Sequence, residues 1–136
     1  MKKDIPQYKV EDFAVAIVPR EENGMRDEEM WDVFVINFRN EPIQNVLVNS
    51  RGYGEIEGEQ MKTTVLRHFF NEIGPQCATH VEPIQTKLFE IANEYWVSFS
   101  FGDYMYDKKY VFVKGSISEE NFTDIPFIDR KGVMIR

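Results

Sequence analysis

The sequence predicts an all-β protein, an antiparallel immunoglobulin-like β-sandwich of about seven strands. Three observations predict this fold class. Short runs of β-branched and aromatic residues recur along the chain, turn residues separate the runs, and apolar positions alternate in the clearest of them. The expected strands are residues 13–18, 31–38, 43–49, 62–70, 78–82, 95–101 and 109–113.

The chain has 136 residues, which is the usual size of one domain. We therefore expect a single domain over residues 1–136. Residues 116–136 show no clear period and contain Pro126 and Gly132, but they end in the apolar run Val133, Met134 and Ile135. An apolar end is more stable when docked than when free in water, so we expect 116–136 to be a docked C-terminal tail.

In the first half of the chain, the expected strand 13–18 is stopped by Pro19. Residues 20–30 are rich in acid and include Asn23 and Gly24, which predicts a solvated loop. The next two expected strands, 31–38 and 43–49, are separated by only four residues that include Pro42, which predicts a β-hairpin.

The middle segment, residues 61–73, permits two interpretations. Its apolar positions follow the period of one helix face, whereas its residue types are β-branched and aromatic. Gly74 and Pro75 signal a turn before the expected strand 78–82, and this favours strands on both sides of it. The alternative is an α+β protein in which one or two helices cover one face of an antiparallel sheet. Residues 83–93 could form a short helix begun by Pro83.

The last two expected strands form the second predicted hairpin. Residues 95–101 alternate between apolar and polar, Gly102 and Asp103 open a turn, and residues 109–113 run back.

The chain carries a formal net charge of −7, which disfavours contact with phosphate backbones and anionic lipids. We therefore expect no nucleic-acid partner and no membrane partner. Lys2 and Lys3 are not followed by the apolar region of a signal peptide. The single cysteine, Cys77, cannot form an internal disulfide, so the expected location is the cytoplasm.

Aromatic residues make up 14% of the chain, and both faces of its strongest strand are apolar. An antiparallel sheet usually keeps one face in water, so something must cover the second face. The cover could be the tail, a helix at 61–73 or another protein chain. For the last case we predict a homo-oligomer, such as a dimer, or an unknown protein partner. The candidate interaction surface consists of Phe34, Ile36, Phe38, Trp96, Tyr110 and Phe112.

No catalytic, cofactor-binding or metal-binding residues are predicted. His68, Glu72, Cys77 and His80 could supply four metal ligands, but their spacing matches no known zinc pattern. Nothing near Cys77 in the sequence would lower its pKa for nucleophilic catalysis. The candidate polar groups for binding a ligand are Tyr53, His68 and His80.

Four stretches carry a resemblance to a known family. They are residues 52–54, 61–70, 93–98 and 106–112. Over residues 10–115 the chain resembles a family of small uncharacterised bacterial proteins, some of which are labelled as the alpha subunit of phenylalanyl-tRNA synthetase. That label implies a role as an accessory protein of translation. The chain is short for a catalytic subunit, shows no class II synthetase motif and is acidic, so no catalytic residues are carried over.

The sequence therefore predicts a non-enzymatic protein-interaction module that self-associates through an aromatic sheet face. The alternatives are a small-ligand-binding protein or enzyme with an aromatic-lined pocket, and the translation accessory protein that the label implies.

Overall fold

Ten strands are found in residues 10–136, the part of the chain that the computed structural model describes. They are β1 (Phe13–Glu22), β2 (Met25–Asn37), β3 (Ile43–Ile56), β4 (Glu59–Lys62), β5 (Leu66–Ile73), β6 (Cys77–Gln85), β7 (Ala92–Phe101), β8 (Tyr104–Phe112), β9 (Thr123–Ile125) and β10 (Arg130–Ile135). Two 3-10 helices, η1 (Thr86–Glu90) and η2 (Glu119–Asn121), lie between strands.

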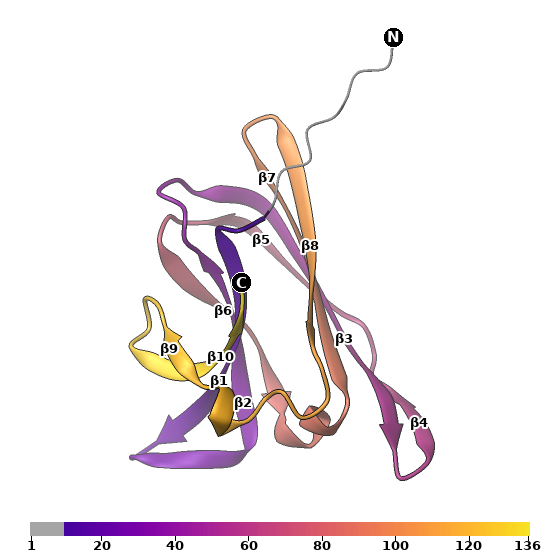
Figure 1. Cartoon of the computed structure of the whole chain (residues 1–136). Coiled ribbons are helices and arrows are strands. Elements are labelled where there is room, and N and C mark those ends of the chain that lie inside the picture. Colours follow the sequence, from indigo (N-terminus) through magenta and orange to yellow (C-terminus); the bar gives the residue numbers. More distant parts are fainter. Residues whose placement is uncertain (1–9) are drawn as a thin grey trace.

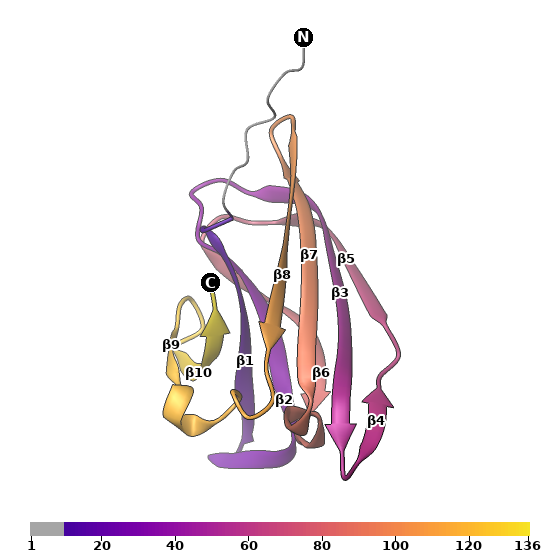
Figure 2. The same cartoon turned by 45° about the vertical axis from the view of Figure 1, so that its right-hand side comes forward.

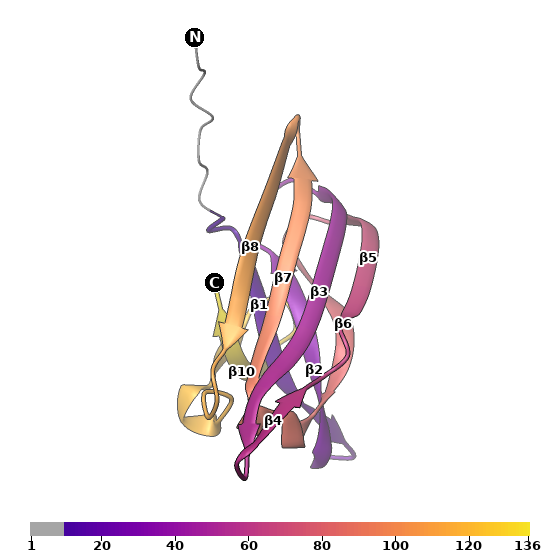
Figure 3. The same ribbon diagram turned by 90° about the vertical axis from the view of Figure 1, so that its right-hand side faces the viewer.

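Two antiparallel sheets form a sandwich (Figure 1). Sheet A has the strand order β6-β2-β1-β10-β9, and sheet B has the order β4-β3-β7-β8. In sheet B, β3 pairs with β5 along its first half and with β4 along its second half. Figure 3 shows β3, β7 and β8 in one layer, with β1 and β2 behind them. The predicted all-β sandwich is thus confirmed, with more strands than expected.

Alternation along the strands builds the core between the two sheets. On β1, Phe13, Val15 and Ile17 point toward sheet B, and on β7 Tyr95 and Phe99 point toward sheet A. All five side chains are at most 3% exposed. The rings of Phe13 and Phe99 lie 5.4 Å apart, so this pair joins the two layers.

The middle segment is extended, and the alternative of a helix at residues 61–73 is wrong. The single strand expected at 62–70 is divided, because β4 ends at Lys62 and β5 begins at Leu66. Residues 63–65 link the two strands, and Thr63 bonds twice to Gly52 of β3. The short helix expected from Pro83 is also wrong, since β6 continues through Gln85 and only the single turn η1 follows.

The hairpin predicted at the end of the chain is confirmed, because β7 pairs with β8 around Gly102 and Asp103. The hairpin predicted between residues 31–38 and 43–49 is wrong. β2 pairs with β1 and β6 in sheet A, whereas β3 lies in sheet B, so the turn carries the chain from one sheet to the other. Asn37 holds this crossing, since its Nδ2 donates to the Glu41 and Gly74 carbonyls at 3.0 and 2.9 Å.

The acidic segment at residues 20–30 is not a loop, contrary to the prediction. β1 and β2 extend through it as a hairpin that pairs Glu21 with Arg26 and Glu22 with Met25. Asn23 and Gly24 have φ of 53° and 78°, the left-handed values that a two-residue hairpin turn requires. The Asn-Gly pair indicates this turn. The high charge of the segment is compatible with strands because most of its residues are exposed.

The second apolar face of β2 is covered within the chain, by the segment that contains β9 and β10. Ile125, Ile128 and Met134 of this segment pack with Phe34 and Ile36 of β2 on the outer side of sheet A. Figure 2 shows β9 and β10 beside β1, on the side away from β7. The sequence allowed three covers for this face: the tail, a helix or another protein chain. The tail covers it.

Candidate functional site

The six residues of the expected interaction surface lie in three different places. Phe34 and Ile36 are 9% and 0% exposed beneath the C-terminal segment, and half-buried Phe38 contacts Phe127 at a ring distance of 5.9 Å. Tyr110 and Phe112 belong to the core between the sheets. Trp96 is 45% exposed on the outer side of sheet B. The six therefore do not form one surface, because alternation sends them to opposite faces of two sheets.

Large apolar side chains are exposed on the outer face of sheet B. One row across the sheet joins Arg67, Asn49, Trp96 and Lys109, each opposite the next in the strand register. The neighbouring row joins Phe69, Leu47, Ser98 and Asp107. Phe69 is 60% exposed. We call the following residues the open face: Leu47, Asn49, Arg51, Arg67, Phe69, Glu94, Trp96, Asp107 and Lys109.

One buried carboxylate lies beside the aromatic part of the open face. Glu94 is 4% exposed and accepts hydrogen bonds from Arg51 Nε at 3.0 Å and from the Tyr53 hydroxyl at 3.2 Å. Burial raises the pKa of Tyr53, and the hydrogen bond to Glu94 raises it further. Lys109 Nζ lies 4.9 Å from the Trp96 ring centre and 3.9 Å from Glu94. Tyr53 thus supports the open face instead of lining a pocket.

The electrostatic balance of the open face differs from that of the whole chain. It carries three cations, Arg51, Arg67 and Lys109, against two anions, Glu94 and Asp107, whereas the chain has a net charge of −7. Arg67 is exposed and forms no ion pair with any residue of the described range. The face therefore combines exposed aromatic rings with a local excess of positive charge.

A cleft of about 400 Å³ opens between the two sheets on the inner side of β3. Its lining residues include Ser50 of β3, Glu82 of β6 and Tyr95 of β7. The Glu82 carboxylate accepts hydrogen bonds from the Ser50 hydroxyl at 3.0 and 3.1 Å. His68 Nε2 lies 2.6 Å from Glu82 Oε1. Of the expected polar groups, only His68 lies beside this cleft.

The geometry of this cluster is unlike that of a catalytic triad. In a triad the imidazole lies between the nucleophile and the carboxylate, where it can take the hydroxyl proton. Here Glu82 lies between Ser50 and His68, so the hydroxyl donates to a carboxylate that is already bonded to the imidazole. Cys77 likewise donates to the Gly74 carbonyl at 3.3 Å and points away from His80.

The four residues considered as metal ligands do not come together. His68 bonds to Glu82 inside the sandwich, His80 bonds to Asp32 on the outer side of sheet A, and Glu72 is paired with Gln44 at an exposed position. Within residues 10–136, no group of three or more His, Cys, Asp or Glu side chains is arranged to hold a metal ion.

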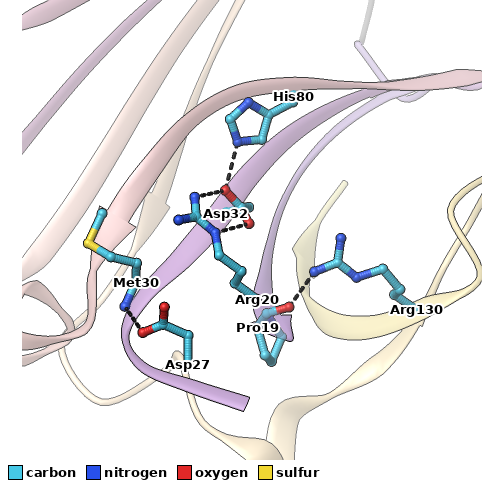
Figure 4. Close-up of polar contacts among 7 residues, drawn as sticks. All are labelled: Pro19, Arg20, Asp27, Met30, Asp32, His80 and Arg130. Atoms are coloured by element: carbon cyan, nitrogen blue, oxygen red, sulfur yellow. Dashed lines mark hydrogen bonds and ion pairs between the residues drawn. The ribbon is translucent and has the colours of Figure 1, made fainter. Parts of the chain in front are cut away.

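His80 belongs to an ionic cluster on the outer side of sheet A, shown in Figure 4. Asp32 accepts hydrogen bonds from Arg20 Nε and Nη2 at 3.0 and 2.6 Å, and His80 Nε2 lies 2.7 Å from its Oδ1. Burial acts to raise the pKa of Asp32, but the hydrogen bonds from Arg20 and His80 outweigh it, so the pKa lies below its ordinary value of 3.8. The groups satisfy one another, which is typical of a structural cluster.

Replacing Asp32 with Asn is expected to lower the free energy of unfolding by about 2 kcal/mol near pH 7, because Arg20 loses its charged acceptor. The folded pKa of Asp32 is depressed below 3.8, so its contribution is present above that pH and disappears as the pH falls further. Urea denaturation at several pH values measures both effects. The exposed Asp124, paired with Lys131 at 3.4 Å, is the control. An Asp32→Asn deficit that persisted undiminished at pH 2 would contradict this account.

Comparison with known proteins identifies no relative. No family model, no curated protein and no solved structure matches the chain. Between residues 10 and 136, no helix has the length and hydropathy needed to cross a membrane. The fold and the local geometry are therefore the basis for the functional argument.

Several residues of these sites were missed at the level of sequence. Phe69 and Leu47 belong to strands that were expected, but their place next to Trp96 depends on the pairing of β3 with both β5 and β7. Ser50 of β3 and Glu82 of β6 belong to opposite sheets, and they meet across the interior of the sandwich. The sequence does not show that these two strands face each other. Glu82 lies in the expected strand 78–82. A charged residue within a strand is the one sequence signal that could have pointed to this site.

Proposed function

We propose that this protein is a non-enzymatic, cytoplasmic protein-interaction module whose open face binds an acidic segment of a partner protein. The observation that carries the proposal is the exposure of Trp96 and Phe69 on a sheet face that residues 10–136 leave open, while β9 and β10 cover the corresponding face of sheet A.

The aromatic side chains supply the apolar centre that such a contact needs. Trp and Arg are enriched among the residues that contribute most to binding, and they act best where the partner excludes water around them. Trp96 has Asn49 on one side and Lys109 on the other in the strand register. Phe69 and Leu47 form the adjacent row, so a partner segment crossing the strands could contact all three apolar side chains.

The charges favour an acidic partner over a second copy through this face. A two-fold contact between two open faces brings the same patch together, so a patch with three cations and two anions would face another with the same excess of positive charge. Like charges at an interface cost affinity, whereas acidic side chains opposite these cations would speed association. The dimer expected from the sequence remains a prediction, which light scattering at several protein concentrations tests.

Selection from a displayed library of random peptides tests the proposed function. We expect the enriched peptides to combine Asp or Glu with aromatic or aliphatic residues. The double variant Trp96→Ala/Phe69→Ala should bind them at least about 30-fold more weakly, because truncating two central anchors costs about 2 kcal/mol or more. Circular dichroism of both proteins checks that the fold is kept.

Two further variants sharpen the test. Met25→Ala removes a side chain that is 75% exposed on the distant β1–β2 hairpin, and it should leave peptide binding unchanged. Arg67→Glu should weaken binding at least about tenfold and reduce its dependence on salt. Enriched peptides that are basic, or that bind the double variant as well as the native protein, would contradict the proposal.

A further inference from the structure

We propose that the cleft between the sheets is a binding site for a small organic cation, an amine with a short apolar body whose ammonium group pairs with Glu82. The cleft shares Arg51 with the open face, but Glu82 and Tyr95 line the cleft and Trp96 and Phe69 do not. Variants of these two pairs therefore test the cleft and the proposed function separately.

The shape of the cleft comes from an interruption in the edge of sheet B. β3 exchanges β4 for β5 as its partner across residues 63–65, and the cleft is lined there by Thr63, Thr64 and Leu66. Gly52 forms part of the wall, and a Cβ at this position would lie 3.0 Å from Ile91 Cδ1 and 3.1 Å from Thr63 Cγ2. A glycine here lets the surrounding side chains approach the backbone closely.

Glu82 is the carboxylate among the residues that line the cleft. Glu82 is 8% exposed and, within the described part of the chain, forms no ion pair with a lysine or arginine. Arg51 also lines the cleft, but its Nε and Nη2 are bonded to Glu94 on the other side of the sheet. The nearest basic group to Glu82 is His68, whose Nε2 lies 2.6 Å from its Oε1. A buried carboxylate in this position favours a cation and repels an anion.

Tyr95 supplies a second polar group to the cleft. Its side chain is 2% exposed and lines the cleft, yet its hydroxyl makes no hydrogen bond to residues 10–136. Burial raises the pKa of Tyr95, and the negative charge of Glu82 raises it further, so the phenol stays neutral. The hydroxyl is not one of the fully buried atoms without a partner in the described residues, so it is accessible from the cleft to a bound molecule. An ammonium group carries three donors, which could serve both the Glu82 carboxylate and the Tyr95 oxygen.

The rest of the lining sets the size and character of the ligand. Apolar side chains surround the polar groups, and they are Met30, Leu66, Ile84 and Leu88. The volume of about 400 Å³ is at the small end of known ligand pockets, which is suited to one ring or a short alkyl chain. A charged head and an apolar body of this size describe a simple primary amine.

Calorimetric titration and ligand-observed NMR with benzylamine test the proposal on the full chain. Benzyl alcohol and benzoate are matched neutral and anionic probes of the same shape. We expect benzylamine to bind, and the other two to bind at least about tenfold more weakly, since only the amine can pair with Glu82. Equal binding of benzylamine and benzyl alcohol, or no binding of benzylamine at millimolar concentration, would overturn the proposal.

Variants locate the binding in the cleft. Glu82→Gln should weaken benzylamine binding at least tenfold and Tyr95→Phe about threefold, whereas Trp96→Ala on the open face should leave it unchanged. Asp32→Asn is a matched control, because Asp32 is 7% exposed and lies outside the cleft, on the outer side of sheet A. If Glu82→Gln does not fold, Leu66→Trp replaces a side chain that is 47% exposed and should block the cleft. Unchanged binding in a folded Glu82→Gln protein, or in Leu66→Trp where the former is unfolded, would overturn the proposal.

Discussion

Replacing Gly132 with alanine is expected to lower the free energy of unfolding by about 3 kcal/mol, as overpacking against rigid neighbours does at its upper range. A Cβ at Gly132 would lie 2.5 Å from the Ile17 carbonyl oxygen and 3.1 Å from Val18 Cα. Both are backbone atoms of β1, so β10 would have to move away from β1. Urea denaturation followed by circular dichroism measures the change.

Gly74→Ala is the matched control for this prediction. The nearest atom to a Cβ there is Cys77 Sγ at 4.0 Å, so the substitution should change the unfolding free energy by less than about 0.5 kcal/mol. Displacing β10 should also expose Phe34 and Ile36, which a dye that binds apolar surfaces would detect. Unfolding of Gly132→Ala at the same urea concentration as the native protein would contradict the packing of the C-terminal segment described above.

Replacing Phe13 with alanine should cost about 4 kcal/mol, within the range for removing a buried phenylalanine from a core. Phe13 is 1% exposed, and its ring lies 5.4 Å from that of Phe99 in the opposite sheet. Its carbonyl also accepts a hydrogen bond of 3.0 Å from the Tyr110 hydroxyl. The loss of the ring leaves a cavity where the two sheets meet, and thermal and urea unfolding both report it.

Met25→Ala is the comparison for Phe13→Ala, because Met25 is 75% exposed and contributes little to the core. It should unfold within about 0.5 kcal/mol of the native protein. A loss of similar size in the two variants would mean that Phe13 does not lie between the sheets.

Much of the fold could be predicted from local sequence patterns. The β7–β8 hairpin follows from clean alternation and a Gly-Asp turn, both of which are local signals. The crossing between β2 and β3 could not be predicted, because a short turn with proline is equally compatible with a hairpin. The observed crossing is held by the hydrogen bond from Asn37 Nδ2 to the carbonyl of Gly74, which is 37 residues away.

The candidate sites were less accessible to sequence reasoning than the fold. Trp96 was assigned to the interaction surface and is exposed. Phe34 and Ile36 were assigned to the same surface, but β9 and β10 cover them. Alternation predicts that both faces of β2 are buried without saying what covers each face. The cleft depends on contacts between β3, β5 and β6, whose residues Ser50, His68 and Glu82 are up to 32 positions apart. No local pattern encodes such a contact.

The central claim is that Trp96 lies on an open, cationic face. Fluorescence quenching tests it directly, because the only other tryptophan, Trp31, is 7% exposed. At constant ionic strength, each quenching constant is divided by that of free N-acetyltryptophanamide, because iodide is intrinsically the stronger quencher. The normalised value should be larger for iodide than for caesium in the native protein, and the difference should disappear in Trp96→Phe. A selected acidic peptide should protect Trp96 from iodide. Equal normalised quenching by the two ions, or iodide quenching that the bound peptide leaves unchanged, would contradict the account.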